Sequence, residues 1–306
     1  AATDAPVTYL PGMAHPRMHN AQTARAAHGA VFDRLAEALD RRDPLADAVA
    51  ADARSLRLLD RALRHGLMAD DPAPLRALIG AVEATPAWVD PARIAVGGRL
   101  ARRAGQLTAT LLALRSLVGG YYTPEGNKPL VLTGRLTAAD AAPRRLGETA
   151  RFVNHVVDHG GLARHGPGLI SAVKVRVMHA AVRGLVDRSG RWDAARWAEP
   201  INQHDMLATV LLFSSILIDG FRTVGLRVTE AEAEDYMHLW RYVGWLMGVE
   251  ATLLPATEAE AVRLQACIRD TLGPPDADSR ALVDALFEVG ERQARTSNRA
   301  STSARL

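Results

Sequence analysis

The sequence predicts an all-α fold with a single globular domain of about ten helices. Apolar residues recur at spacings of three and four through most of the 306 residues, as they do along the buried face of a helix. No alternating strand pattern, glycine-rich dinucleotide motif or phosphate-binding loop occurs, which disfavours nucleotide-binding α/β folds. With 48% hydrophobic residues, the chain can bury a sizeable core.

The first half of the chain contains four predicted helical stretches. Asp90 is the expected N-cap of the fourth, with Pro91 at its first helical position. Gly119-Gly120 is expected to break that helix, and Tyr121–Pro129, which contains Pro, Gly and Asn, predicts a loop. The four stretches are Ala21–Leu39, Ala46–Leu67, Leu75–Glu83 and Pro91–Leu117.

The second half contains six predicted helices. Thr137 is the expected cap of the first, and Thr229 with Glu232 has the spacing of a capping box. We expect residues 1–20 to form an extended N-terminal segment, 21–295 the helical catalytic domain, and 296–306 a disordered tail. The six helices are Ala138–His159, Gly168–Val186, Ile201–Phe221, Thr229–Val249, Glu258–Leu272 and Asp278–Gln293.

Composition excludes several classes of protein. The formal charge is only +3, and no basic block is interleaved with aromatic residues, so we expect no nucleic-acid partner. Cys267 is the only cysteine, which excludes an intrachain disulfide, a thiolate zinc site and an iron–sulfur cluster; it is expected to be an inert core thiol. The apolar run Leu207–Ile218 is too short to span a bilayer, so no transmembrane segment is expected. A cytoplasmic location is favoured over secretion, although a chain that begins Ala-Ala-Thr is compatible with a removed leader.

The most informative motif lies in the helix predicted around residues 168–186. Arg176, His179 and Arg183 stand at i, i+3 and i+7, so their side chains project from one face of that helix. Burying two arginines is costly unless something anionic contacts them, and positive neighbours keep an imidazole neutral and able to bind a metal. A haem meets both demands, since its iron binds the imidazole and its propionates bind the arginines. The alternative is an ordinary core or surface histidine beside arginines on a solvated face.

A resemblance to a known family supports the haem interpretation. Arg176–Arg183 (Arg-Val-Met-His-Ala-Ala-Val-Arg), together with Arg144–Thr149 (Arg-Arg-Leu-Gly-Glu-Thr) upstream, resembles the rubber oxygenases. This family comprises latex clearing proteins and MpaB-type oxygenases, which are all-helical haem b enzymes. The resemblance runs from about Leu130 to about Pro255 and includes the segments Gln203–Asp205 and Gly244–Glu250.

The resemblance implies a role for each matching residue. His179 would be the proximal iron ligand, flanked by Arg176 and Arg183 as cofactor-binding residues, whereas Arg145 and Thr149 would lie near the distal side of the haem. Latex clearing proteins can carry a lysine just before that threonine, able to cap the iron. Glu148 occupies this position here, so we expect ferric iron that is five-coordinate or water-bound.

Glu148 has two interpretations. In an apolar distal pocket its pKa would rise, which would make it a general base or a proton donor to bound dioxygen. Alternatively, it forms an ordinary surface ion pair with Arg145 or Arg151.

Three other patterns carry weaker signals. His155 and His159 stand at i and i+4, which suits a metal site but is also common among surface residues that complement a helix C-terminus. His204-Asp205 predicts either a site role or an N-terminal hydrogen-bond cluster. Gly244 and Gly248 predict close helix packing.

The sequence therefore predicts a haem b-dependent oxygenase that uses dioxygen as co-substrate. Its partners would be a hydrophobic, unsaturated small molecule and an electron donor, and the resemblance implies oxidative carbon–carbon cleavage or a related oxidation. The alternatives are a non-catalytic haem sensor or carrier, and a helical interaction protein without haem.

Overall fold

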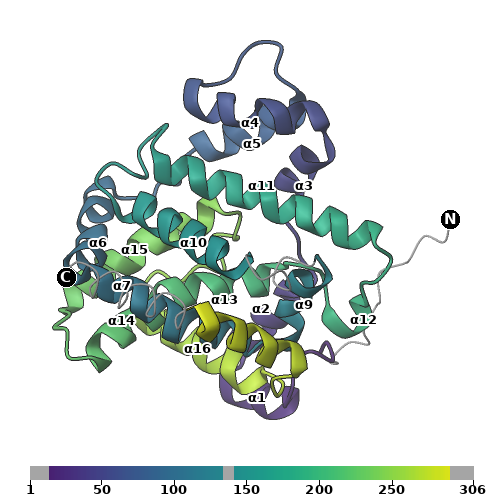
Figure 1. Cartoon of the computed structure of the whole chain (residues 1–306), viewed down its shortest axis with the longest axis vertical. Helices are drawn as coiled ribbons and strands as arrows, with labels where there is room; N and C mark the ends of the chain where they lie inside the picture. The colour runs from purple at the N-terminus through teal and green to yellow at the C-terminus, as the bar shows by residue number, and fades with distance from the viewer. Residues whose placement is uncertain (1–13, 134–140, 290–306) are drawn as a thin grey trace, which may run out of the picture.

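A computed structural model describes residues 14–133 and 141–289, and every regular element within these residues is a helix (Figure 1). The all-α prediction is confirmed. Thr137, the first thirteen residues and the tail from residue 296 lie outside the described residues, so the predictions made for them stay predictions.

The N-terminal third divides into shorter helices than predicted. The stretch predicted from residue 21 to 39 forms α1 (Ala21–His28) and α2 (Ala30–Ala38), which separate at Gly29, where φ is 51°. The next stretch forms α3 (Pro44–Ala51) and α4 (Ala53–His65). Asp52 separates them because its extended backbone ends α3 while its side chain caps α4. Helix α5 (Ala73–Glu83) follows the predicted stretch closely.

The region from Asp90 to Tyr121 is helical beyond its predicted end. Asp90 caps α6 (Pro91–Ala104) as predicted, and Gly105, with φ of 57°, separates it from α7 (Gln106–Leu111). A π-helix, η1 (Leu112–Leu117), then leads into α8 (Val118–Tyr121). The predicted break at Gly119-Gly120 is wrong, because both glycines lie inside α8. Gly120 packs close to Leu212, since a Cβ there would lie 2.9 Å from Cδ1, the end of that flexible side chain.

The loop predicted from residue 121 to 129 is also wrong. Pro124 begins α9 (Pro124–Leu132), because a proline fits the first turn of a helix, where its missing N–H is not required. Pro129 lies inside the same helix.

The remaining helices agree with the prediction to within a few residues, with two differences. Ser214 splits one predicted helix in two, and a short helix at residue 194 was not predicted. The capping box of Thr229 and Glu232 is confirmed. The helices are α10 (Ala141–Val157), α11 (Pro167–Arg188), α12 (Ala194–Trp197), α13 (Gln203–Phe213), α14 (Ser215–Thr223), α15 (Glu230–Leu246), α16 (Glu258–Thr271) and a helix over 277–289.

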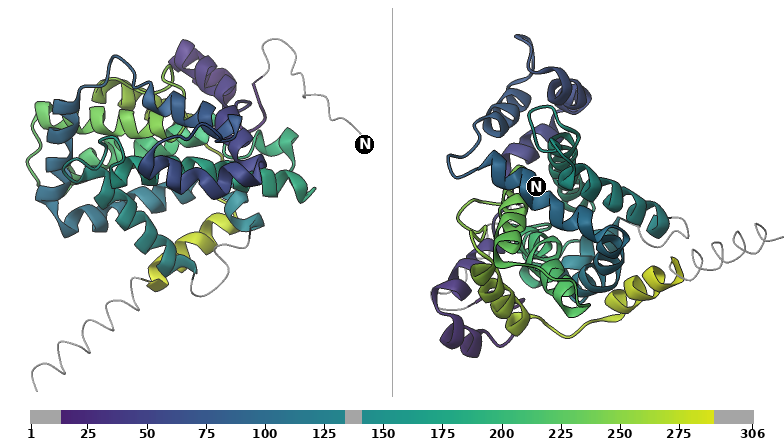
Figure 2. Two further views of the ribbon diagram at one scale, coloured as in Figure 1. Left: turned by 90° about the horizontal axis from the view of Figure 1, so that it is seen from above. Right: turned by 90° about the vertical axis from the view of Figure 1, so that its left-hand side faces the viewer.

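Helix α11 is the long element around which the others are arranged. In Figure 1 it crosses the molecule with α3, α4 and α5 on one side and α10 and α13 on the other. Helix α15 supplies much of the core, where the fully buried Trp240 contacts Phe152, Phe213 and Tyr236. Both views of Figure 2 show the 277–289 helix projecting from one corner of the bundle, where Leu282 and Leu286 join a smaller apolar cluster.

One stretch of the described residues is long and apolar enough to cross a membrane, whereas the sequence prediction was that none is. Gln203–Thr223 has a mean hydropathy of 1.5 in its most apolar window, and 56% of that window is buried inside the structure. Ser214 divides the stretch into α13 and α14. Core helices pass the same test of length and composition, so the finding is weak evidence for a membrane span.

Cys267 lies in the core as predicted, with no exposed surface. Burial raises the pKa of its thiol to about 11, so the thiolate is scarce at neutral pH.

Two helical glycines provide a matched test of this packing. Helix α6 packs closely on α10 at Gly98, where a Cβ would lie 2.1 Å from the Val157 carbonyl oxygen. Gly80 in α5 has no neighbour within 4 Å of the same position. We expect Gly98→Ala to lower the free energy of unfolding by ~2 kcal/mol or more, because backbone atoms must move apart. Gly80→Ala should raise it by ~0.5–1 kcal/mol. Urea denaturation checks both values, and equal effects of the two substitutions would contradict this close approach.

Candidate functional site

Two ion pairs join α11 to α3, one buried on both sides and one in which the carboxylate is partly exposed. Arg176 donates to Asp43 through Nε (2.6 Å to Oδ2) and through Nη2 (2.9 Å to Oδ1), and both residues are buried. Asp43 also caps α3 by accepting from the Ala46 amide at 3.3 Å. Gly248, with φ of 91°, lies against this pair, because a Cβ there would be 2.2 Å from Oδ2 of Asp43. Arg176 therefore needs the negative charge of Asp43, and the pair leaves room only for a glycine at position 248.

The second pair lies one turn further along α3. Asp47 Oδ1 is 2.7 Å from both Nε and Nη2 of Arg183, although only Nε makes a hydrogen bond of good geometry. Arg183 Nη1 donates to the Ile201 carbonyl oxygen at 3.2 Å. The Arg183 side chain is 2% exposed, so Nη2 is a buried donor without a well-oriented acceptor.

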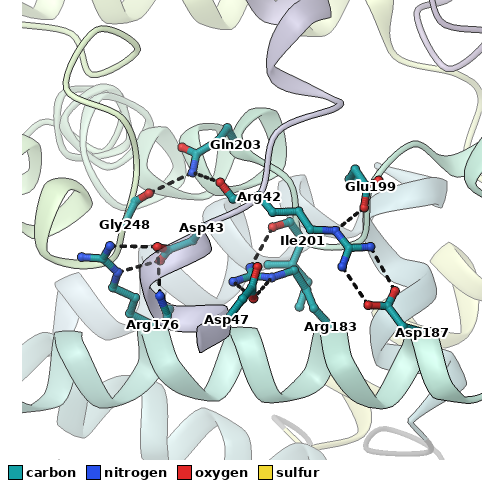
Figure 3. A network of polar contacts seen from close by, with 11 residues as sticks. Arg42, Asp43, Asp47, Arg176, Arg183, Asp187, Glu199, Ile201, Gln203 and Gly248 are labelled. Carbon is teal, nitrogen blue, oxygen red and sulfur yellow. Dashed lines mark hydrogen bonds and ion pairs between the residues drawn. The ribbon is translucent and has the colours of Figure 1, made fainter. Parts of the chain in front are cut away.

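A wider polar network continues from these pairs (Figure 3). Gln203 Nε2 donates to the carbonyl oxygens of Arg42 (3.2 Å) and Gly248 (2.9 Å). Arg42 donates to both carboxylate oxygens of Asp187 at 2.7 and 3.0 Å and also binds Glu199. The chain just before α3 is thereby fixed to α11, α13 and the turn after α15.

His179 lies between the two arginines and is partly buried. Its Nδ1 is buried, and no residue in the described part of the chain hydrogen-bonds to it. Burial, helped by the positive charges of Arg183 and Arg145 and opposed by Asp43, lowers the pKa of His179 to about 4. The imidazole is therefore neutral at pH 7 and has a nitrogen available to bind a metal.

The residues predicted on the distal side lie on α10, which packs against α11. Arg145 and Thr149 are partly buried, and Arg145 is close enough to His179 to lower its pKa. Within residues 14–133 and 141–289, Arg145 has no ion pair. The structure thus brings Arg145 and His179 together.

Glu148 lies at the surface of α10 and forms an ion pair there, but with a different arginine from those predicted. Its side chain is 55% exposed, and its Oε1 accepts from Nε of Arg144 at 2.9 Å, an i,i+4 pair. The surface ion pair proposed from sequence therefore exists, with Arg144 in place of Arg145 or Arg151.

The weaker sequence patterns resolve into local structure. His155 Nδ1 lies 3.0 Å from the Ser171 hydroxyl, and His159 is exposed. The described residues contain no group of three or more His, Cys, Asp or Glu side chains placed to hold a metal ion. The structure therefore gives no support to a metal site at His155 and His159.

His204-Asp205 belongs to a hydrogen-bond cluster at the start of α13. Asp205 accepts from both terminal nitrogens of Arg17 and from Asn202 Nδ2 at 3.1 Å. Although burial raises it, Arg17 and His204 keep the pKa of Asp205 well below its usual range. The N-terminal cluster predicted as one alternative is present.

Sequence reasoning missed Asp43 and Asp47, which neutralise the two arginines. The Asp43-Pro44 step is typical of a helix start, so the capping role of Asp43 had a local signal. Its pairing with Arg176, 133 residues away, had none.

Comparison with known proteins places the chain in a family of oxygenases. Residues 101–306 match the model of the family described as "ER-bound oxygenase mpaB/B'/Rubber oxygenase, catalytic domain", and the chain belongs to this family.

Two relatives extend the comparison. The chain is 27% identical over 233 residues to a rubber oxygenase of Streptomyces sp. (strain K30), a match that covers 75% of this chain and 55% of that protein. The chain thus spans about half the length of this relative. A solved structure of latex clearing protein LCP in the closed state superposes with a TM-score of 0.67 at 25% identity, covering 81% of this chain and 68% of that chain.

The ion pair between Arg176 and Asp43 can be tested by a double-mutant cycle. We expect Asp43→Asn to lower the free energy of unfolding by ~3 kcal/mol or more, because it leaves a buried guanidinium without its counter-charge. The double variant with Arg176→Met should recover part of that loss. Glu83→Gln, which breaks the exposed pair with Arg164, is the control and should change stability by less than ~1 kcal/mol. Additive effects of Asp43→Asn and Arg176→Met would contradict direct coupling.

Proposed function

We propose that this chain is a haem b-dependent oxygenase, with His179 as the axial ligand of the iron and dioxygen as co-substrate. The observation that carries the proposal is His179 itself. It is a neutral imidazole, with a buried nitrogen that has no partner in the described residues, on a helix fixed by the ion pairs of two buried arginines. Membership of an oxygenase family supports the same conclusion.

The residues around His179 fit a haem. A buried polar atom without a partner is costly, and neutral imidazole is a common axial ligand of haem iron. Arg183 has a buried Nη2 that can donate to a propionate oxygen, so we propose it as the propionate-binding residue. Arg176, whose Nε and Nη2 bind Asp43, we propose as the residue that positions α11. Because no Cys-x-x-Cys-His motif occurs, attachment would be non-covalent.

Helix α10 supplies the groups for the reaction. Haem, when bound, supplies the iron at which dioxygen is activated. Arg145, Thr149 and Phe152 stand at i, i+4 and i+7, so they share one face of the helix. Arg145 would stabilise negative charge that develops on oxygen, and the Thr149 hydroxyl would hold a proton. Phe152, which packs on Trp240, would exclude water.

For the substrate we propose a hydrophobic molecule with a carbon–carbon double bond. Cleavage of that bond by one dioxygen gives two carbonyl groups and consumes no external electrons. Hydroxylation of the same molecule would require two electrons from a donor. Oxygen uptake measured with and without a reductant therefore distinguishes the two reactions.

The test combines a spectrum with an assay. Protein produced with iron and a haem precursor should carry one extractable haem b per chain and consume dioxygen when an isoprenoid oligomer is added. A coloured protein without oxygen consumption would indicate a sensor or carrier. Colourless protein would refute the haem proposal.

His179→Ala should remove most of the bound haem, because the iron–nitrogen bond and the group that fills the site are lost together. His159→Ala, which alters an exposed histidine just beyond the end of α10, is the matched control and should retain full haem content. The Soret band and the haem-to-protein ratio report both results. Full occupancy with an unchanged Soret band in His179→Ala would show that another residue binds the iron.

Glu148→Gln tests whether Glu148 is an acid–base group of the reaction or a surface residue in an ion pair. Because Glu148 is exposed and pairs with Arg144, which is more exposed still, we expect substrate turnover to stay within about twofold of the parent. A positioned acid–base group would instead lose about a hundredfold. Haem content, measured alongside kcat, separates a lost proton transfer from lost cofactor. A hundredfold fall at full haem content would assign Glu148 to catalysis.

A further inference from the structure

A basic cavity lies where α2, α15 and α16 meet the segment 251–256. Its volume is about 470 Å³, and no residue of α10 or α11 lines it. Three arginines line its wall, Arg34, Arg241 and Arg263, and Glu260 is the one acid among the described residues that line it. Val31, Ala251 and Ala256 are accessible lining residues that add apolar surface, whereas Leu253 and Leu254 lie beneath it and are buried.

Arg241 is held in a fixed position at this cavity. Its guanidinium lies over the Trp88 ring, with Cζ 4.1 Å from the ring centroid. Its Nε is buried and has no hydrogen-bond partner in the described residues. Burial lowers the pKa of Arg241, against the attraction of Glu260. A rigid, partly desolvated guanidinium with a free donor is suited to bind a carboxylate or a phosphate group.

The positive charge of the cavity is not neutralised by the protein. Glu260 uses Oε2 to accept from the Ala256 amide at 2.7 Å, and Arg34 donates to the Thr252 carbonyl oxygen at 3.3 Å. None of the three arginines forms an ion pair with a carboxylate within the residues that the structure describes. Three positive charges facing one negative charge raise the local concentration of anions.

We propose that this cavity binds a small amphiphilic anion, with its charged head on Arg241 and Arg263 and its apolar part on Val31 and Ala256. A carboxylate on a short hydrocarbon chain and a phosphate ester share this chemistry. The proposal is independent of haem binding, because the two sites share no residue.

Calorimetric titration at constant ionic strength tests the proposal, with octanoate, acetate and inorganic phosphate as probes and chloride as the balancing salt. Octanoate should bind about tenfold more tightly than acetate, since burial of its chain adds to the charge interaction. Arg241→Gln and Arg263→Gln should each weaken octanoate binding about tenfold, the usual cost of losing a charge-assisted hydrogen bond. Arg263 is exposed, so its substitution keeps the test valid if Arg241→Gln unfolds.

Two controls make the outcome decisive. Arg227→Gln removes an exposed arginine outside the cavity and should leave the affinity unchanged. His179→Ala should also leave it unchanged, whereas loss of binding in that variant would place the anion at the proposed haem site and overturn the inference. Equal affinities in the parent and in both cavity variants would likewise overturn it. Phosphate binding at least as tight as that of octanoate would refute the apolar part of the proposal.

Discussion

The docking of α11 on α3 depends on two ion pairs whose arginines are both buried. Arg176 and Arg183 are seven residues apart, about 10 Å along a helix, and Asp43 and Asp47 are four apart, about 6 Å. The arginine side chains cover the difference, so both pairs form together at the register that the two helices adopt. A buried charge without its partner costs several kcal/mol, and a slipped register would leave two such charges. The position of His179 follows from this register.

The polar contacts around the Arg176–Asp43 pair also connect segments that lie far apart in the sequence. Gly248, from the turn after α15, packs against the Arg176–Asp43 pair and accepts a hydrogen bond from Gln203 at the start of α13. Arg42, next to Asp43 in sequence, reaches Asp187 at the end of α11. One polar layer thus joins segments that are more than 100 residues apart. The bonds of Gln203 and Arg176 satisfy buried groups, whereas the pair of Arg42 with Asp187 lies at the partly exposed edge of the layer.

The sequence predicted what depends on local spacing. Helical periodicity gave the fold class, and the Arg-x-x-His-x-x-x-Arg spacing placed three side chains on one face of α11. Periodicity did not predict the helix breaks at Asp52 and Ser214, because apolar residues continue at helical spacing on both sides of each break. Gly119 and Gly120 were misread because a glycine inside a helix that packs against Leu212 looks the same in sequence as a glycine that ends a helix. The aspartates that pair with α11 could not be predicted, since nothing local links residue 43 to residue 176.

The charges of the two arginines beside His179 are balanced within the protein, so the site does not need a bound haem in order to fold. Because Asp43 and Asp47 already neutralise the two arginines of α11, that helix is held in place by the protein's own charges. A haem would therefore meet a helix in its final register, and little of its binding free energy would be used to order the ligand. Arg145 differs from the α11 arginines, since no carboxylate within the described residues pairs with it. Its charge acts on the His179 side of α10, where it adds to burial and to Arg183 in lowering the pKa of the imidazole and is available to stabilise negative charge on a bound molecule.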